Sequence, residues 1–100
     1  MKQIRVSAPA ERDLDDIWYY IATTSGSIET ADEVVDSITR TFPLFARAPE
    51  AGTRRDEIEP SLRGFPITNY IVYYRETNNH VVISRVIHGM RNQKRAFTAE

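Results

Sequence analysis

The first half of the chain carries apolar residues at helical spacing, in two successive stretches. The apolar positions of the first stretch are Ala10, Leu14, Ile17, Trp18 and Ile21. Acidic residues fill most of the positions between them, so the pattern predicts an amphipathic helix with an acidic outer face. Ser7 is placed to cap this helix, and Pro9 is tolerated in its first turn.

The second stretch begins after Ser27 and continues the helical spacing. Its apolar positions are Ala31, Val34, Val35, Ile38, Phe42 and Phe45. Because only residues 24–27 separate the two stretches, we expect two helices packed antiparallel. Pro43 lies inside the second pattern, and its ring clashes with the carbonyl four residues earlier, so a kink or a break is expected there.

Strand patterns replace the helical ones in the second half. Residues 62–75 and 81–91 predict three strands in a row, and a short strand over residues 3–7 precedes the first helix. Asn78 and Asn79 are expected to form the turn before the last strand, since asparagine accepts positive backbone dihedrals. Pro66 places its strand at a sheet edge or a bulge. The last strand has apolar residues on both of its faces, as in a central strand that is flanked on both sides.

The element order is therefore β-α-α-β-β-β. It predicts an α+β fold in which an N-terminal helical hairpin packs on a small antiparallel sheet. One hundred residues are enough for a single hydrophobic core, so residues 1–100 are interpreted as one domain. The polar tail around Ala96 and Phe97 is expected to be a short helix or a disordered arm.

Composition narrows the classes of protein that fit. The net charge of −1 divides into −4 over residues 1–50 and +3 over residues 51–100, which indicates two electrostatic faces. The chain has no cysteine, so disulfides and thiolate metal sites are excluded and a cytoplasmic location is expected. We expect no membrane span and no signal peptide. Metal-ligand spacings and phosphate-binding loops are absent from the sequence, so we expect no cofactor and no metal.

Short motifs occur in a fixed order over nearly the whole chain. They are Ala10 with Asp13-Leu14, Ile17 and Tyr20-Ile21; Ala31; Phe45 with Pro49 and Gly52; Leu62-Arg63-Gly64-Phe65; Tyr70-Ile71-Val72-Tyr73-Tyr74-Arg75; and Ile83 with Arg85-Val86-Ile87-His88-Gly89 and Arg91. This ordered set resembles the ParE/RelE toxin superfamily of type II toxin–antitoxin modules, and the ParE branch most closely. The resemblance implies a similar fold and a toxin that its cognate antitoxin neutralises in a hetero-oligomer.

The two branches of this superfamily differ in target. The resemblance to ParE implies inhibition of DNA gyrase, whereas RelE-like toxins cut messenger RNA on the ribosome with acid–base groups and cations. Before its second strand this chain has Arg54 and Arg55 but no lysine, and Phe97 has no hydroxyl. A nuclease acting within ribosomal RNA should also be strongly basic. We therefore expect a gyrase inhibitor without catalytic residues; the alternative is an endoribonuclease using Arg85, His88 and Arg91.

Exposed aromatic residues and strand arginines are the candidate binding residues. We expect Arg63, Arg85, Met90 and Arg91 at the target-binding surface, and Trp18, Tyr19, Tyr20 and Phe65 at the antitoxin-binding surface. Three consecutive aromatics on a helix cannot all point inward, so at least one of residues 18–20 should be exposed. The arginines also have a structural interpretation, over aromatic neighbours or in ion pairs. His88 has one too, as a histidine that only hydrogen-bonds its neighbours.

Overall fold

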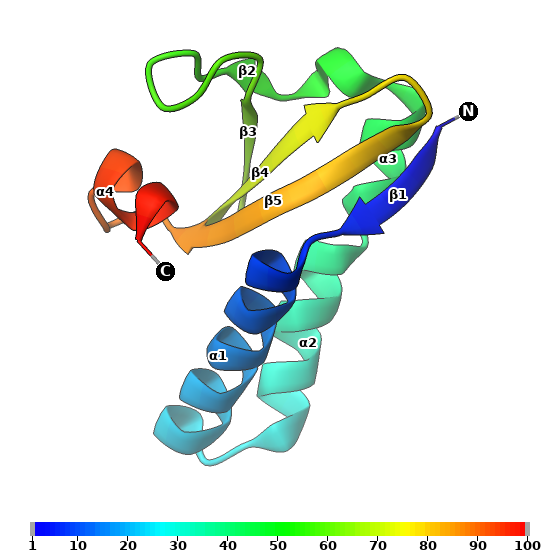
Figure 1. The fold of residues 1–100 in the computed structure, drawn as a ribbon. Helices are drawn as coiled ribbons and strands as arrows, with labels where there is room; N and C mark the ends of the chain where they lie inside the picture. The colour runs from blue at the N-terminus through cyan, green and yellow to red at the C-terminus, as the bar shows by residue number, and fades with distance from the viewer. Residues whose placement is uncertain (1, 100) are drawn as a thin grey trace.

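The computed structural model describes residues 2–99 and shows helices on both faces of a five-stranded sheet (Figure 1). In chain order the elements are β1 (Gln3–Val6), α1 (Ala8–Ser25), α2 (Ile28–Thr39), α3 (Phe42–Arg47), the 3-10 helix η1 (Pro49–Ala51), β2 (Thr53–Arg54), β3 (Arg63–Ile67), β4 (Tyr70–Glu76), β5 (His80–His88) and α4 (Gln93–Thr98). The predicted α+β fold with an N-terminal helical hairpin is confirmed. The polar tail forms α4, so it is a short helix.

The sheet has the strand order β1-β5-β4-β3-β2. Strands β3, β4 and β5 form the predicted antiparallel meander, but β1 pairs with β5 in parallel, so the sheet is mixed. A four-residue strand carries no sequence signal for its direction, which is why the pattern alone did not show this pairing. The predicted central strand is confirmed, since β5 lies between β1 and β4. Pro66 lies on β3 beyond the short pairing with β2, where β3 is an edge strand as predicted.

Local signals set the helix boundaries. The Ser7 hydroxyl accepts a hydrogen bond from the Ala10 backbone N–H at 3.2 Å and caps α1. Gly26 ends α1 in the left-handed conformation, at φ 70°. Pro43 lies in the first turn of α3, and residues 40–41 separate α2 from α3, so the expected break is confirmed.

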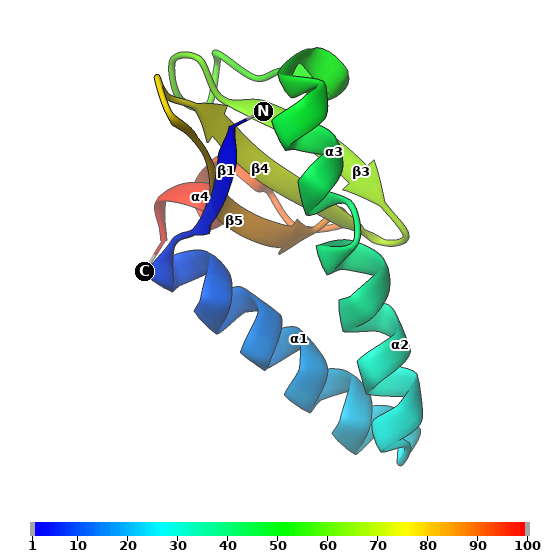
Figure 2. The same ribbon diagram turned by 90° about the vertical axis from the view of Figure 1, so that its right-hand side faces the viewer.

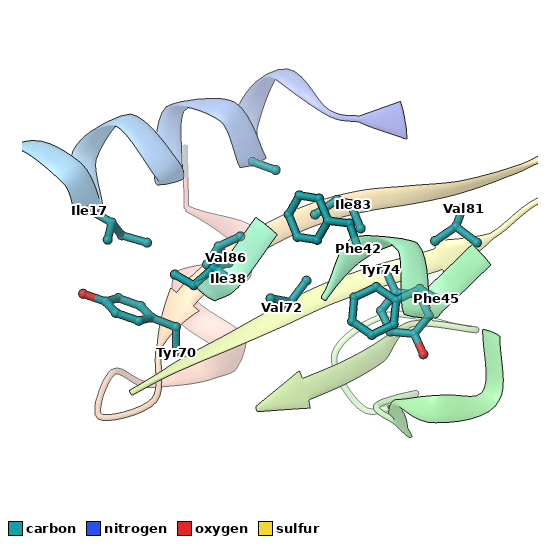
Figure 3. Close-up of a cluster of buried hydrophobic side chains, with 11 residues drawn as sticks. Ile17, Ile38, Phe42, Phe45, Tyr70, Val72, Tyr74, Val81, Ile83 and Val86 are labelled. Carbon is teal, nitrogen blue, oxygen red and sulfur yellow. The ribbon is translucent and has the colours of Figure 1, made fainter. Parts of the chain in front are cut away.

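The larger core lies between the helices and one face of the sheet (Figure 3). Its buried side chains are Ala10, Ile17, Ile38, Phe42, Phe45, Tyr70, Val72, Tyr74, Val81, Ile83 and Val86. The Phe45 ring stacks on Tyr74 with centroids 4.1 Å apart and meets the edge of Phe65 at 5.4 Å. Phe65 is therefore a half-buried member of this core, because its aromatic ring packs under α3.

A smaller core covers the opposite face of the sheet, where α4 packs (Figure 2). It consists of Leu62, Tyr73, Ile87 and Ala96, with Ile58, Ile71 and Phe97 packed against them. Tyr73 and Tyr74 are neighbours on β4, so they fill the two cores, one on each face of the sheet. Tyr73 pairs with Arg85 and Tyr74 pairs with Ile83, which leaves Ser84 as an extra residue in β5.

The turn before β5 has its predicted place but not its predicted backbone. Among the non-glycine residues of the described chain, positive φ occurs at Ser61 (66°) and Thr68 (52°). The positive dihedrals expected of Asn78 and Asn79 are therefore wrong. Hydrogen bonds from Thr77 hold this turn instead, since its backbone N–H donates to the His80 carbonyl at 2.8 Å.

Candidate binding groove

The helical hairpin extends past one end of the sheet (Figure 1). A groove of about 610 Å³ lies between the two. Its lining residues are Tyr20 and Ile21 of α1, Val34 of α2, Thr68 and Asn69 of the β3–β4 turn, Tyr70 of β4, His88 of β5 and Arg91. The hairpin thus forms one wall and the end of the sheet forms the other. Aromatic side chains line both walls, aliphatic ones line the hairpin wall, and an arginine lies beside them. This combination is typical of a protein-binding surface.

The two tyrosines of the groove differ in exposure. Tyr20 is 64% exposed, whereas Tyr70 is 8% exposed. Burial raises the pKa of the Tyr70 hydroxyl above its ordinary value, so this phenol keeps its proton at neutral pH. The Tyr70 ring meets the His88 ring edge to face, with centroids 5.2 Å apart. Tyr70 therefore supplies a fixed aromatic surface, and Tyr20 supplies one that a partner can cover.

His88 is held by its neighbours at the end of β5. Its Nδ1 accepts a hydrogen bond from the Met90 backbone N–H at 3.0 Å, and its carbonyl accepts one from the Gln93 side-chain amide at 2.9 Å. A ring nitrogen that accepts a backbone N–H is not available to take a proton from a substrate. The contacts of His88 thus agree with its structural interpretation.

A second depression of about 270 Å³ adjoins the groove. The two share Thr68, Asn69, Tyr70 and His88, and the second is completed by Pro66, Ile71, Gly89 and Met90. Met90 is 88% exposed. Four of the candidate residues, Tyr20, His88, Met90 and Arg91, therefore lie together at this end of the molecule.

The other aromatic candidates lie elsewhere. The Trp18 indole Nε1 donates to Asp32 Oδ1 at 2.8 Å and so joins α1 to α2 within the hairpin. Tyr19 is 67% exposed on α1 but does not line the groove. The prediction that at least one of residues 18–20 is exposed is confirmed. Phe65 packs against Phe45 in the core and is half-buried, so an antitoxin could reach only part of this side chain.

Arg63 and Arg85 also lie away from the groove. Arg63 Nη1 donates to the Gly52 carbonyl at 2.7 Å, beside a separate pocket of about 210 Å³. Arg85 donates to both carboxylate oxygens of Asp13, and its side chain is 12% exposed. Arg85 and His88 lie three residues apart on β5, so their side chains fall on opposite faces of the sheet: Arg85 on the face covered by α4, and His88 on the side of the groove. The structure does not bring Arg85 together with His88 and Arg91.

Sequence reasoning missed two residues that matter to these contacts, Tyr70 and Asp13. Tyr70 was hidden in an apolar run, although the polar pair Thr68-Asn69 that interrupts the run could have located the turn beside it. In the sequence, Asp13 looks like another acidic residue on the outer face of α1. No local signal identifies it as the partner of a residue 72 positions away.

Two further properties of the described residues bear on the site. In residues 2–99, no group of three or more His, Cys, Asp or Glu side chains is arranged to hold a metal ion. None of the helices in this part of the chain combines the length and the apolar character needed to cross a bilayer.

Comparison with known proteins gives a consistent result. The sequence model described as the ParE toxin of type II toxin-antitoxin system, parDE, matches residues 4–93. Toxin ParE1 of Caulobacter vibrioides is 31% identical over 94 residues, covering 94% of this chain and 96% of the relative. Toxin ParE3 of the same organism is 27% identical over 92 residues, covering 92% of this chain and 91% of the relative.

Two solved structures share the fold. One is the chromosomal ParDE TA system from P. aeruginosa, with a TM-score of 0.77 and 20% identity over 88% of this chain and 96% of the other. The second is the toxin-antitoxin complex RelBE2 from Mycobacterium tuberculosis, with a TM-score of 0.63 and 21% identity over 87% of this chain and 96% of the other. At these identities the likeness concerns the architecture.

Proposed function

The chain belongs to the ParE toxin family of type II toxin–antitoxin systems, and we propose that it inhibits DNA gyrase by binding, with no catalytic group of its own. The composition of the groove is the observation that carries this proposal. The groove has aromatic and aliphatic residues on its hairpin wall, Tyr70 on its sheet wall, a single cation, Arg91, and a histidine whose Nδ1 accepts a backbone N–H. RNA cleavage needs a base, an acid and a cation around one phosphate, and this set is incomplete there. A gyrase inhibitor acts in the cytoplasm.

The partner that neutralises the toxin is a cognate antitoxin that occupies the same groove. An amphipathic segment would place apolar side chains between Tyr20 and Tyr70, and a carboxylate on it would pair with Arg91. Met90 and Arg91, the residues proposed to contact gyrase, would then be covered. Antitoxin and gyrase are therefore expected to bind in competition.

A supercoiling assay with purified gyrase tests the proposed target. The wild-type toxin should inhibit supercoiling, and Arg91→Ala and Met90→Ala should weaken the inhibition by about tenfold or more, the loss typical of a residue central to an interface. Arg47→Ala is the matched control, since Arg47 is also exposed but lies on α3 outside the groove. Unchanged supercoiling at an excess of wild-type toxin would refute the proposal.

Two adjacent tyrosines provide the test of the antitoxin site. Tyr20→Ala should raise the Kd of the toxin–antitoxin complex by about tenfold or more, because truncating a buried interface tyrosine costs more than about 1 kcal/mol. Tyr19→Ala should leave it nearly unchanged, although Tyr19 and Tyr20 are similarly exposed, at 67% and 64%. Equal effects of the two substitutions would show that the antitoxin binds elsewhere on the hairpin.

The second candidate function is messenger RNA cleavage on the ribosome. The one observation in its favour is that His88 and Arg91 line the same groove. Against it, the Arg85 guanidinium is engaged by Asp13 and by carbonyls of α4. Primer extension on translated messages separates the two functions. Codon-phased cuts that disappear in His88→Ala would establish the nuclease and overturn gyrase binding as the activity.

A further inference from the structure

A nearly buried ion pair joins the first helix to the last long strand. Asp13 Oδ2 accepts from Arg85 Nε at 2.7 Å, and Asp13 Oδ1 accepts from Arg85 Nη2 at 3.0 Å. The two side chains are 14% and 12% exposed. This bidentate arrangement fixes the orientation of the guanidinium plane as well as its position.

The same carboxylate completes the edge of β5. Strand β1 pairs with β5 only as far as the Val6–Ile83 pair, so the next part of β5, which pairs with β4 on one edge, has no strand on its other edge. Asp13 Oδ2 accepts a hydrogen bond from the Val86 backbone N–H at 2.9 Å. Asp13 thus takes the place of the missing neighbour's carbonyl and holds Arg85 at a defined point of the strand.

The remaining nitrogen of Arg85 is directed to the end of α4. Its Nη1 donates to the carbonyls of Ala96, Phe97 and Ala99 at 2.9, 3.0 and 3.0 Å. A helix leaves its last carbonyls without partners, and a cation there is favourable. Because α4 has only six residues, it depends on such contacts to remain folded.

The position of α4 in turn shapes the end of the groove. Gln93, its first residue, donates from Nε2 to the carbonyls of His88 and Arg91 at 2.9 and 2.8 Å. Gln93 Oε1 accepts from the Tyr73 hydroxyl at 2.7 Å. The segment that carries Met90 and Arg91 is therefore held from both ends, by β5 before it and by α4 after it.

We propose that Asp13 is a positioning residue for the binding surface: it orients Arg85, Arg85 docks α4, and docked α4 holds the segment that presents Met90 and Arg91 to the partner. The inference rests on the proposed function for the contact made by Arg91. It assigns to one nearly buried carboxylate of α1 a control over a surface beyond the C-terminal end of β5.

Two conservative substitutions test this chain of contacts. Asp13→Asn removes the charge with little change of shape, and Arg85→Lys keeps the charge but cannot bridge a carboxylate and three carbonyls at once. Amide hydrogen exchange should accelerate by about tenfold or more at Ala96 and Ala99, whose N–H groups bond within α4, a change equal to about 1.4 kcal/mol of local stability. Exchange in α2 should stay near wild type. Asp16→Asn, an exposed acid of the same helix, is the control.

Binding measurements show whether the effect passes through Arg91. Asp13→Asn should weaken antitoxin binding and gyrase inhibition about as much as Arg91→Ala does, and should add little when combined with it. If Asp13→Asn weakens binding equally in the wild type and in the Arg91→Ala variant, or if amide exchange becomes uniformly faster in all elements, the positioning role is overturned. The Asp13–Arg85 pair would then only stabilise the fold in general. A third outcome is that exchange becomes faster only in α4, while Arg91→Ala changes neither antitoxin binding nor gyrase inhibition. That result would reject the proposed groove but leave the docking of α4 by Arg85 intact.

Discussion

Among the glycines of this fold, Gly52 has the least room for a side chain, because Tyr74 packs directly against its backbone. Replacing Gly52 with alanine is therefore a sharp test of the packing. Its backbone, at φ −81° and ψ 159°, suits any residue, so space is what requires glycine here. A Cβ would lie 2.8 Å from both Cε1 and the hydroxyl oxygen of Tyr74. The Tyr74 ring cannot retreat, because it is fully buried and stacked on Phe45.

The cost of Gly52→Ala has two parts. Overpacking a well-packed core costs about 1–3 kcal/mol. The added methyl group also displaces the Tyr74 hydroxyl, which accepts from the Gly52 N–H and donates to the Pro49 carbonyl, both at 2.7 Å. Each such hydrogen bond contributes about 0.5–1.5 kcal/mol. We therefore expect a loss of about 3 kcal/mol, which lowers the Tm of a domain of this size by about 12–24 °C.

A double-mutant cycle identifies the contact responsible. Tyr74→Phe alone should cost about 1–3 kcal/mol, because it leaves the Gly52 N–H and the Pro49 carbonyl unsatisfied. With the hydroxyl removed, the methyl group of Gly52→Ala has more room, so the double variant should lose less than the sum, by about 1 kcal/mol. Chemical denaturation measures all four stabilities. Gly89→Ala is the control, since its nearest contact would be an ordinary 3.5 Å to the Asn69 carbonyl. Additive losses, or a Gly52→Ala variant as stable as wild type, would refute the reasoning.

Three further predictions concern stability. Burial raises the pKa of the Tyr73 and Tyr74 hydroxyls, so the stability they contribute should be complete below about pH 10 and decrease as the pH rises above it; denaturant titrations at several alkaline pH values measure this, and Tyr73→Phe should make the decrease shallower. Trp18→Phe should cost about 1 kcal/mol through loss of the bond to Asp32, and a cycle with Asp32→Ala that shows no coupling would contradict it. Ser7→Ala should cost about 1–2 kcal/mol in a thermal melt, because the Ser7 hydroxyl both caps α1 and donates to the Ser84 carbonyl at 3.0 Å; an unchanged Tm would show that water replaces both bonds.

Most elements of this fold could be predicted because their signals are local. The apolar stripe from Ala10 to Ile21 lies within α1, and Ser7 caps this helix as its position suggested. Pro43 interrupts the second helix because a ring without an N–H is accepted only in a first turn. The apolar run of β5 correctly indicated a strand covered on both faces.

The candidate site was predicted less completely. Tyr20, His88, Met90 and Arg91 were named from sequence, and the structure places them at one end of the molecule. Arg85 was named with them because it shares a strand with His88. Residues three apart on a strand face opposite sides, so the spacing of Arg85 and His88 already separated them, and the alternation of side chains was the signal that could have shown it.

The helices, the meander, the place of Pro66 at an edge or a bulge and the toxin family could be predicted, since each depends on residues near one another in the chain or on a motif order. The folded molecule was needed to show that β1 runs parallel to β5, that Asp13 engages Arg85, and that the hairpin and the sheet enclose a groove. These features bring together residues that are far apart in the chain, such as Tyr20 and Tyr70 in the lining of the groove. The neighbouring sequence of a charged or aromatic residue is the same whether its side chain faces solvent or a distant partner. Its role is therefore set by the packing of the fold.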